Sequence, residues 1–130
     1  MISSIRLDGS TACMAIDGAT DTEVFQTYVR KVLCPVLRPG DVVIMDNLTP
    51  HKNQETLNLI IRAGAQVLFL PAYSPDLNPI EKMWSKVKNF LRGAEARTQT
   101  ALIEAIGLAL QTVTAQDAIN WFASCGYSFI

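Results

Sequence analysis

The sequence lacks any long hydrophobic run and any strong excess of one charge. No apolar window approaches the ~20 residues that a membrane-spanning helix needs, and the first residues lack the charged segment and apolar run of a secretory leader. Eleven Lys and Arg stand against 12 Asp and Glu, giving a formal net charge of −1, whereas free-standing nucleic-acid-binding domains usually carry a basic excess. We therefore expect a cytoplasmic protein without membrane contact, in which any contact with DNA is local.

Cysteine and histidine are also scarce. Cys13, Cys34 and Cys125 are odd in number and widely spaced, and together with the single His51 they make a poor zinc site. Because disulfides persist mainly in oxidising compartments, we interpret the three cysteines as free thiols in a reducing one. The sequence also has no internal repeat and no Gly-rich loop of the kind that cradles nucleotide phosphates.

What is present is the composition of a folded domain: 130 residues, 49% of them hydrophobic, which suits one domain over residues 1–130. The pattern predicts a hairpin over 2–18, helices over 22–37 and 51–64, buried strands over 41–47 and 65–71, and helices over 80–92, 98–113 and 116–124. Thr49 is expected to cap the second helix, with Pro50 first in it. The strand–helix–strand order predicts a parallel pair in an α/β fold.

Asp46 follows the first buried strand, and open α/β sheets place ligand sites at the carboxyl ends of their strands. A carboxylate in that position is well placed for binding or catalysis. The alternative is an Asx turn with Asn47, which residues of this type often form.

Glu81 is the second acid of interest. "NPIE" predicts Asn78 as the N-cap of a helix with Pro79 first and Glu81 third, which is nearly a capping box. Ile80, Met83, Trp84, Val87 and Leu91 form its apolar face, and Glu81, Ser85, Lys88 and Arg92 form an adjacent polar one. That polar row is either a solvated face or a surface on which Lys88 and Arg92 contact a phosphate backbone.

An Asp and a Glu suffice for one Mg²⁺, because waters and substrate phosphates supply its other ligands. A two-metal site usually needs a further carboxylate.

Three segments together resemble the catalytic domain of DDE transposases, in the bacterial insertion-sequence branch of the mariner-like superfamily. They are "MDNLTPHK", "FLPAYSPDLNPIEKMWSKVKNFLR" and "ARTQTALIEAI". The similarity runs over essentially the whole chain. Thirty-four residues lie between Asp46 and Glu81, the spacing that this branch shows between its second and third catalytic acids.

The resemblance implies a ribonuclease-H-like α/β fold, a mixed sheet flanked by helices, and phosphoryl transfer on DNA that depends on Mg²⁺ or Mn²⁺. Water would cleave the phosphodiester at the transposon end, and the freed 3′-hydroxyl would attack target DNA. Asp46 and Glu81 would be metal ligands. Asn47, His51 and Lys52 match the family motif and are expected to shape the site and contact DNA. The residues that match the loop before the catalytic helix are Tyr73, Ser74, Pro75, Asp76, Asn78 and Pro79.

The family's first catalytic Asp lies on a central strand that precedes the hairpin, and neither that strand nor its acid is in this sequence. Asp8 and Asp17 belong to turn dipeptides and are poor replacements. We therefore expect a catalytic domain that lacks its first central strand and is inactive alone. It would be completed by an upstream transposase segment or a homo-oligomer. The alternatives are a non-catalytic remnant, a regulator that binds full-length transposase, and a small phosphate-binding protein unrelated to DNA.

Overall fold

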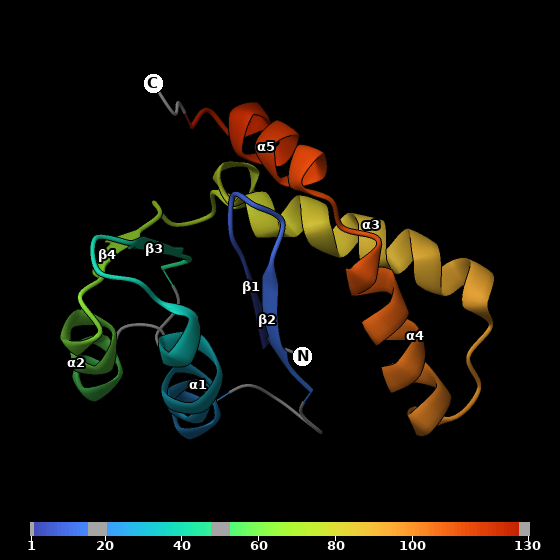
Figure 1. The fold of residues 1–130 in the computed structure, drawn as a ribbon, viewed down its shortest axis with the longest axis horizontal. Coiled ribbons are helices and arrows are strands. Elements are labelled where there is room, and N and C mark those ends of the chain that lie inside the picture. Colours follow the sequence, from blue (N-terminus) through green and yellow to red (C-terminus); the bar gives the residue numbers. More distant parts are fainter. Residues whose placement is uncertain (1, 16–20, 48–52, 128–130) are drawn as a thin grey trace. The chain divides into compact units, whose positions relative to one another are not determined.

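The computed structural model describes residues 2–15, 21–47 and 53–127, which form a mixed α/β fold with small sheets and several helices (Figure 1). The strands are β1 (Ile2–Ile5), β2 (Thr11–Met14), β3 (Val42–Met45) and β4 (Gln66–Phe69). The α-helices are α1 (Thr22–Tyr28), α2 (Gln54–Arg62), α3 (Pro79–Ala94), α4 (Gln99–Gln111) and α5 (Ala115–Ser124). None of the helices in these ranges is long and apolar enough to cross a membrane.

The chain folds into two compact units. The first contains residues 1–4 and 12–75, and the second contains residues 5–11 and 76–130. The hairpin contributes residues to both units, so the division does not follow a cut at one point of the chain. The single domain expected over residues 1–130 stays a prediction.

The N-terminal hairpin is confirmed. β1 and β2 pair with each other, and the turn between them closes with hydrogen bonds from Arg6 N to Ser10 O and from Gly9 N to Arg6 O. Asp8 Oδ1 accepts from Ser10 N at 2.8 Å, the local bond that makes Asp common in turns. Gly9 takes φ +88°, which a side chain at this position would disfavour. The Asp17-Gly18 turn lies outside the described residues.

The helical segment predicted over 22–37 changes type along its length. Asp21 caps α1 by accepting from Val24 N at 2.8 Å. After Tyr28 the backbone widens into a π-helical segment, η1 (Val29–Leu33), and then tightens into a 3₁₀ turn, η2 (Cys34–Val36). Pro35 accounts for the change because it has no N–H to donate to a helical ladder.

The parallel pair of strands is also confirmed. β3 and β4 pair with Val42 opposite Gln66 and Met45 opposite Phe69, and α2 connects them. Their carboxyl ends therefore lie at the same edge, where Leu70 N donates to Met45 O at 2.8 Å.

The expectation that both strands are buried is wrong for one of their two faces. Side chains alternate across a sheet, and the face with Val43, Met45, Val67 and Phe69 packs into the core with α1 and α2. Figure 1 shows both helices on the same side of the strands. On the other face Val42 is 54% and Leu68 is 50% exposed, because no described element of this unit covers it. The continuous apolar run therefore predicts a strand correctly here, but it does not mean that both faces of the strand are buried.

The predicted start of the second helix is wrong as well. α2 begins at Gln54, and its cap is Asn53, whose side chain accepts from Thr56 N at 3.2 Å. Thr49 and Pro50 lie outside the described residues. Both Thr and Asn are good caps, and Asn53 forms the additional bond with the hydroxyl of Thr56, a fully buried side chain. Gly64 ends the segment in a left-handed conformation, φ +89°, as a helix-terminating glycine does.

The core of the first unit forms around Tyr28. Its buried members are Phe25, Tyr28, Val29, Leu33, Met45, Ile60 and Ala65. The Tyr28 hydroxyl donates to Ala12 O at 2.7 Å, which ties α1 to β2. Burial raises the pKa of Tyr28 to about 12. The hydroxyl therefore stays protonated, and able to donate a hydrogen bond, throughout the pH range in which proteins are normally handled.

The second unit is built on α3, which packs against α4 and α5. Met83 and Val87 of its predicted apolar face are buried. Thr98 caps α4, and Thr114 caps α5 in a full capping box with Asp117. Tyr127 extends this packing, since its ring meets Phe122 edge-on and its hydroxyl donates to Leu77 O at 2.7 Å. All three cysteines are free, and Cys125 is buried.

Lys86 links α3 to the start of α5. Its ammonium donates to the Thr112 carbonyl at 2.8 Å and forms an ion pair with Asp117. The bond from Lys86, followed by the backbone bond from Thr114, holds the pKa of Asp117 below its usual range. A lowered carboxyl pKa means that the folded state binds the proton less well than the unfolded state does, so this contribution is present above the unfolded pKa of about 3.9.

We predict that Asp117→Asn lowers the free energy of unfolding by about 0.5–1 kcal/mol at pH 7, as expected for a partly exposed pair. The contribution is lost as the pH falls through the folded pKa of Asp117, so the difference from wild type should shrink steadily below pH 4. Urea unfolding of both proteins at pH 7 and pH 3 measures it. An equal difference at both pH values would contradict the assignment to charge.

Candidate active site

The site begins with the end of β3. Asp46 directly follows Met45, the last residue of this strand, and Met45 is anchored through its carbonyl to Leu70 N. The strand pairing therefore fixes the backbone from which the half-buried Asp46 side chain extends. This is the placement that the sequence predicted for it.

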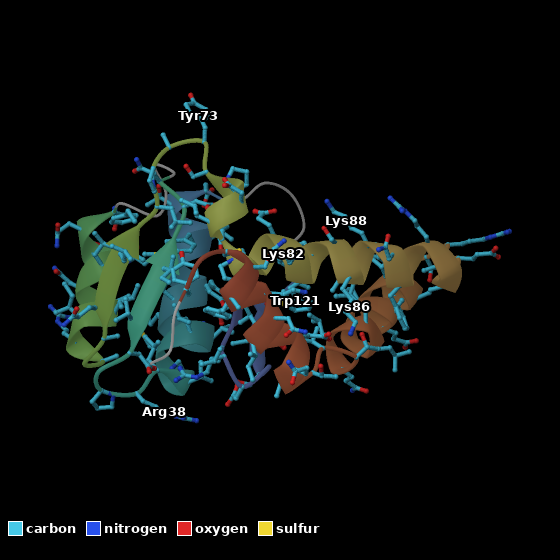
Figure 2. The ribbon with its side chains drawn as sticks, turned by 90° about the horizontal axis from the view of Figure 1, so that it is seen from above. Arg38, Tyr73, Lys82, Lys86, Lys88 and Trp121 are labelled. Atoms are coloured by element: carbon cyan, nitrogen blue, oxygen red, sulfur yellow. The ribbon has the colours of Figure 1, made fainter. Side chains whose placement is uncertain are left out.

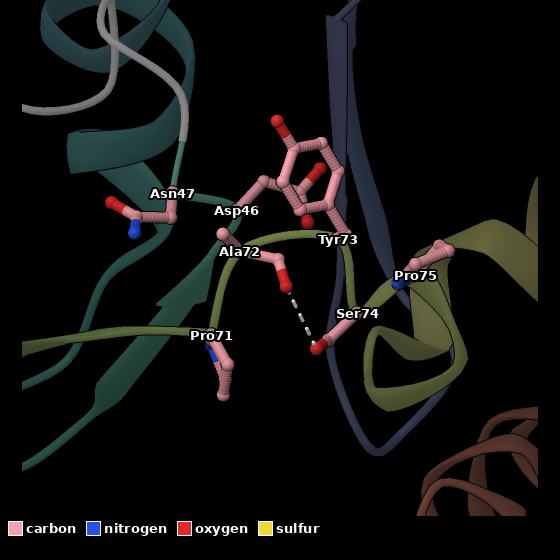
Figure 3. A pocket seen from close by; sticks show the side chains of 7 residues that line it. All are labelled: Asp46, Asn47, Pro71, Ala72, Tyr73, Ser74 and Pro75. Atoms are coloured by element: carbon pink, nitrogen blue, oxygen red, sulfur yellow. Dashed lines mark hydrogen bonds between the residues drawn. The ribbon is translucent and has the colours of Figure 1, made fainter.

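Asp46 lines an open pocket of about 290 Å³ (Figure 3). The described residues that line it are Asp46, Asn47, Pro71, Ala72, Tyr73, Ser74 and Pro75. They come from the ends of β3 and β4, which the parallel register brings together. Four of them, Asn47, Tyr73, Ser74 and Pro75, are among the predicted site residues, and the structure brings these four together with Asp46.

Pro71 and Ala72 are pocket residues that the sequence analysis did not select. A signal was available, because both come just after the second strand of a parallel pair, and such strand ends share one edge. Neither residue has a chemically reactive side chain, so only its position after the strand indicates a place in the site.

The pocket loop has a defined conformation. Tyr73 has φ +57°, a left-handed value that is uncommon for a residue other than glycine. Ser74 Oγ donates to Ala72 O at 3.3 Å across this turn. Pro75 then begins a short 3₁₀ turn, η4 (Pro75–Leu77), which leads towards α3. Asp76 is exposed on that turn.

Glu81 lies in the first turn of α3, in the second unit, where its side chain is exposed. Asn78 caps the helix by accepting from Ile80 N at 3.4 Å, and Pro79 is first, as predicted. The Asn78 side chain accepts from the N–H of Ile80 rather than from that of Glu81, whose N–H donates to the Asn78 carbonyl at 3.1 Å.

The polar face of α3 is exposed along its length, at Glu81, Ser85, Lys88 and Arg92. Figure 2 shows Lys88 projecting away from α4 and α5, whereas Lys86 lies on the side of α3 that faces them. Arg92 Nη1 donates to Asn89 Oδ1 at 3.1 Å. The sequence thus placed these side chains on the correct face, and their contact with DNA stays a prediction.

His51 and Lys52 lie outside the described residues. Within the described ranges no three His, Cys, Asp or Glu side chains group closely enough to hold a metal ion. The pocket itself offers one carboxylate, from Asp46, and the carboxamide of Asn47. These oxygen atoms could supply some of the ligands of a Mg²⁺ ion, since Mg²⁺ keeps several waters and often takes only one or two carboxylates.

Comparison with known proteins gives a consistent result. A family model described as DDE superfamily endonuclease matches residues 1–103. The human histone-lysine N-methyltransferase SETMAR is 37% identical over 78 residues, which cover 59% of this chain and 11% of that protein. The Tcb1 transposase of Caenorhabditis briggsae is 32% identical over 85 residues, 62% of this chain and 31% of the relative.

The Tc1 transposase of Caenorhabditis elegans is 31% identical over 78 residues, which cover 60% of this chain and 29% of that protein. The chain spans less than a third of each of these relatives. The family match extends over most of its length, from the hairpin through α3 and into α4. The chain belongs to the DDE superfamily endonuclease family.

Proposed function

We propose that this chain is the part of a DNA transposase that carries two of its metal-binding acids and takes part in metal-dependent DNA cleavage and strand transfer. The observation that carries the proposal is the placement of Asp46 at the end of β3, in an open pocket formed with the loop at 71–75. Its family membership and its similarity to the Tcb1 and Tc1 transposases support the reaction class.

We also propose that the parallel β3–β4 pair belongs to a ribonuclease-H-like mixed sheet, of which the hairpin forms another part. The βαβ connection through α2 supports this arrangement. The assignment to the bacterial insertion-sequence branch rests on the motif spacing between Asp46 and Glu81.

Asp46 and Glu81 would hold Mg²⁺ or Mn²⁺. When bound, the ion would stabilise the negative charge that develops on the phosphoryl oxygens during displacement. The protein would position the reactants. The pairing of β3 with β4 fixes the backbone at Asp46, and Lys88 and Arg92 would attract the phosphate backbone of DNA along α3. Asn47, His51 and Lys52 are proposed to shape the site and contact the transposon end or the target DNA.

The competing proposal is a non-catalytic fragment that binds full-length transposase and regulates it. The exposed apolar side chains Val42 and Leu68 on the open face of the β3–β4 pair favour some further protein contact. Co-purification with full-length transposase that is insensitive to Asp46→Asn, from a protein without cleavage activity, would select this alternative.

Metal removal tests the enzymatic proposal directly. We predict that the protein expressed from its native locus cleaves a labelled duplex carrying its transposon end in Mg²⁺ or Mn²⁺, and that EDTA reduces cleavage to background. Restoring Mg²⁺ in excess over EDTA should restore the rate, which serves as the control for irreversible damage. Cleavage that persists undiminished in EDTA would refute the proposal.

A further inference from the structure

Tyr73 is the most exposed large hydrophobic side chain in the described ranges. Its relative exposure is 102%, so its ring packs against nothing in the protein. Figure 2 shows the side chain standing clear of the ribbon at the tip of its loop. Aromatic side chains have much apolar surface and are usually well buried, so a ring left wholly in water at the rim of a pocket needs an explanation.

The conformation of the loop keeps the Tyr73 ring in solvent and prevents it from packing against the protein surface. Tyr73 keeps a left-handed backbone with φ +57°, which is disfavoured for a residue with a Cβ. Pro71 and Pro75 restrict the backbone on either side, and the Ser74 hydroxyl donates across the turn to Ala72 O. Strained residues of this kind cluster at functional sites, where the surrounding structure maintains them.

The described residues that line the pocket beside Tyr73 include an acid and no cation. Among the described residues that line it, Asp46 is the charged one, and the others are polar or apolar. A contact that these described residues make with a nucleotide therefore cannot depend on a positive charge. Stacking of an aromatic ring on a base is such a contact, and it works with every base because each has a π-face.

We infer that Tyr73 stacks on a base of the DNA strand next to the phosphodiester held at Asp46, and so positions that strand for cleavage. This inference rests on the proposed function and names the contact that the pocket makes with its substrate. Tyr73 acts here as a positioning residue, since its hydroxyl takes no part in the chemistry.

Base removal combined with mutation tests the contact. Wild type, Tyr73→Ala and Tyr73→Phe are compared, each as expressed from the native locus, for binding of a fluorescein-labelled transposon-end duplex in Ca²⁺ and for cleavage in Mg²⁺. The same measurements are repeated on duplexes with an abasic nucleotide at each position flanking the cleaved bond. Because the ring is fully exposed, Tyr73→Ala should leave the melting temperature unchanged, which thermal unfolding verifies.

We expect Tyr73→Ala to weaken binding and slow cleavage of intact DNA roughly tenfold or more, the range of base–aromatic stacking, and Tyr73→Phe to behave as wild type. At one abasic position wild type should lose the same factor, and Tyr73→Ala should lose nothing further. Normal binding and cleavage by Tyr73→Ala, or a loss that multiplies with every abasic position, overturns the inference while the proposed function stands. A wild-type protein that neither binds nor cleaves overturns both.

Discussion

In the protein expressed from its native locus, replacing Asp46 by asparagine should reduce metal-dependent DNA cleavage at least about 100-fold, the size of effect seen when one group that stabilises transition-state charge is removed. Asparagine keeps the shape of the side chain and loses the negative charge that a cation requires. The fold should be unaffected, because the backbone at this point is held by the β3–β4 pairing and the Leu70 N to Met45 O bond. Single-turnover cleavage of an end-labelled duplex measures the rate, and circular dichroism verifies the fold.

Asp41 provides a matched control for this variant. It lies at the opposite end of β3, where its carboxylate accepts from Arg38 N at 2.7 Å. Because an asparagine oxygen can accept the same bond, Asp41→Asn should leave the cleavage rate within about twofold of wild type. Full activity in Asp46→Asn, or an equal loss in both variants, would remove Asp46 from the metal site.

Glu81→Gln should have an effect of similar size for the same reason, with Glu95→Gln as its control. Glu95 follows the last residue of the same helix and is exposed, with φ +49°. The comparison separates loss of a particular carboxylate from a general change in the charge of α3. If Glu81 acts only in the first turn as a favourable charge near a helix N-terminus, Glu81→Gln should lower stability by a few tenths of a kcal/mol and leave the rate unchanged.

Gly9→Ala should destabilise the protein by roughly 2 kcal/mol or more, since two costs combine: a Cβ at positive φ and a backbone collision. Gly9 has φ +88°, and a Cβ placed on it would lie 2.8 Å from the carbonyl carbon of Thr114 and 2.9 Å from Ala115 N. These are backbone atoms at the cap of α5, so they cannot swing aside as a flexible side chain does. The free energy of unfolding in urea measures the effect.

Gly40→Ala separates the two costs. Gly40 has nearly the same backbone angle, φ +90°, but a Cβ there would meet nothing within 4 Å. This variant should therefore lose only the conformational part, about 1 kcal/mol. Equal losses in Gly9→Ala and Gly40→Ala would mean that the hairpin turn does not lie against the start of α5 in solution.

The sequence predicted best those features that neighbouring residues determine. The cap at Asn78 is an example, because its side chain bonds to a backbone N–H only two residues away. The cap of α2 at Asn53 was not predicted, although asparagine is as good a cap residue as threonine. The predicted apolar face of α3 is confirmed at Met83 and Val87 for a similar reason, since a helical period is visible within four residues.

Features that depend on distant segments could not be read from the sequence. Whether a face of β3 is covered depends on which elements pack against it. In the sequence Val42, Val43 and Ile44 are all apolar, so the sequence predicts equal burial for the three. The Lys86–Asp117 pair joins residues 31 positions apart, in a sequence with many other possible partners. The pocket was predicted in part. The position of Asp46 follows from its place after a strand, whereas the exposure and left-handed backbone of Tyr73 are visible only in the three-dimensional structure.

The contact between the hairpin turn and the cap of α5 also has a consequence during synthesis. During translation Gly9 leaves the ribosome about 105 residues before Thr114. At roughly 5–20 residues per second, the turn waits about 5–20 s for the backbone against which it packs. The first unit holds its own helices and parallel strands within residues 12–75 and can form while synthesis continues. The second unit must close late, because its hairpin turn is synthesised before the helices of the first unit and its own helices are synthesised after them.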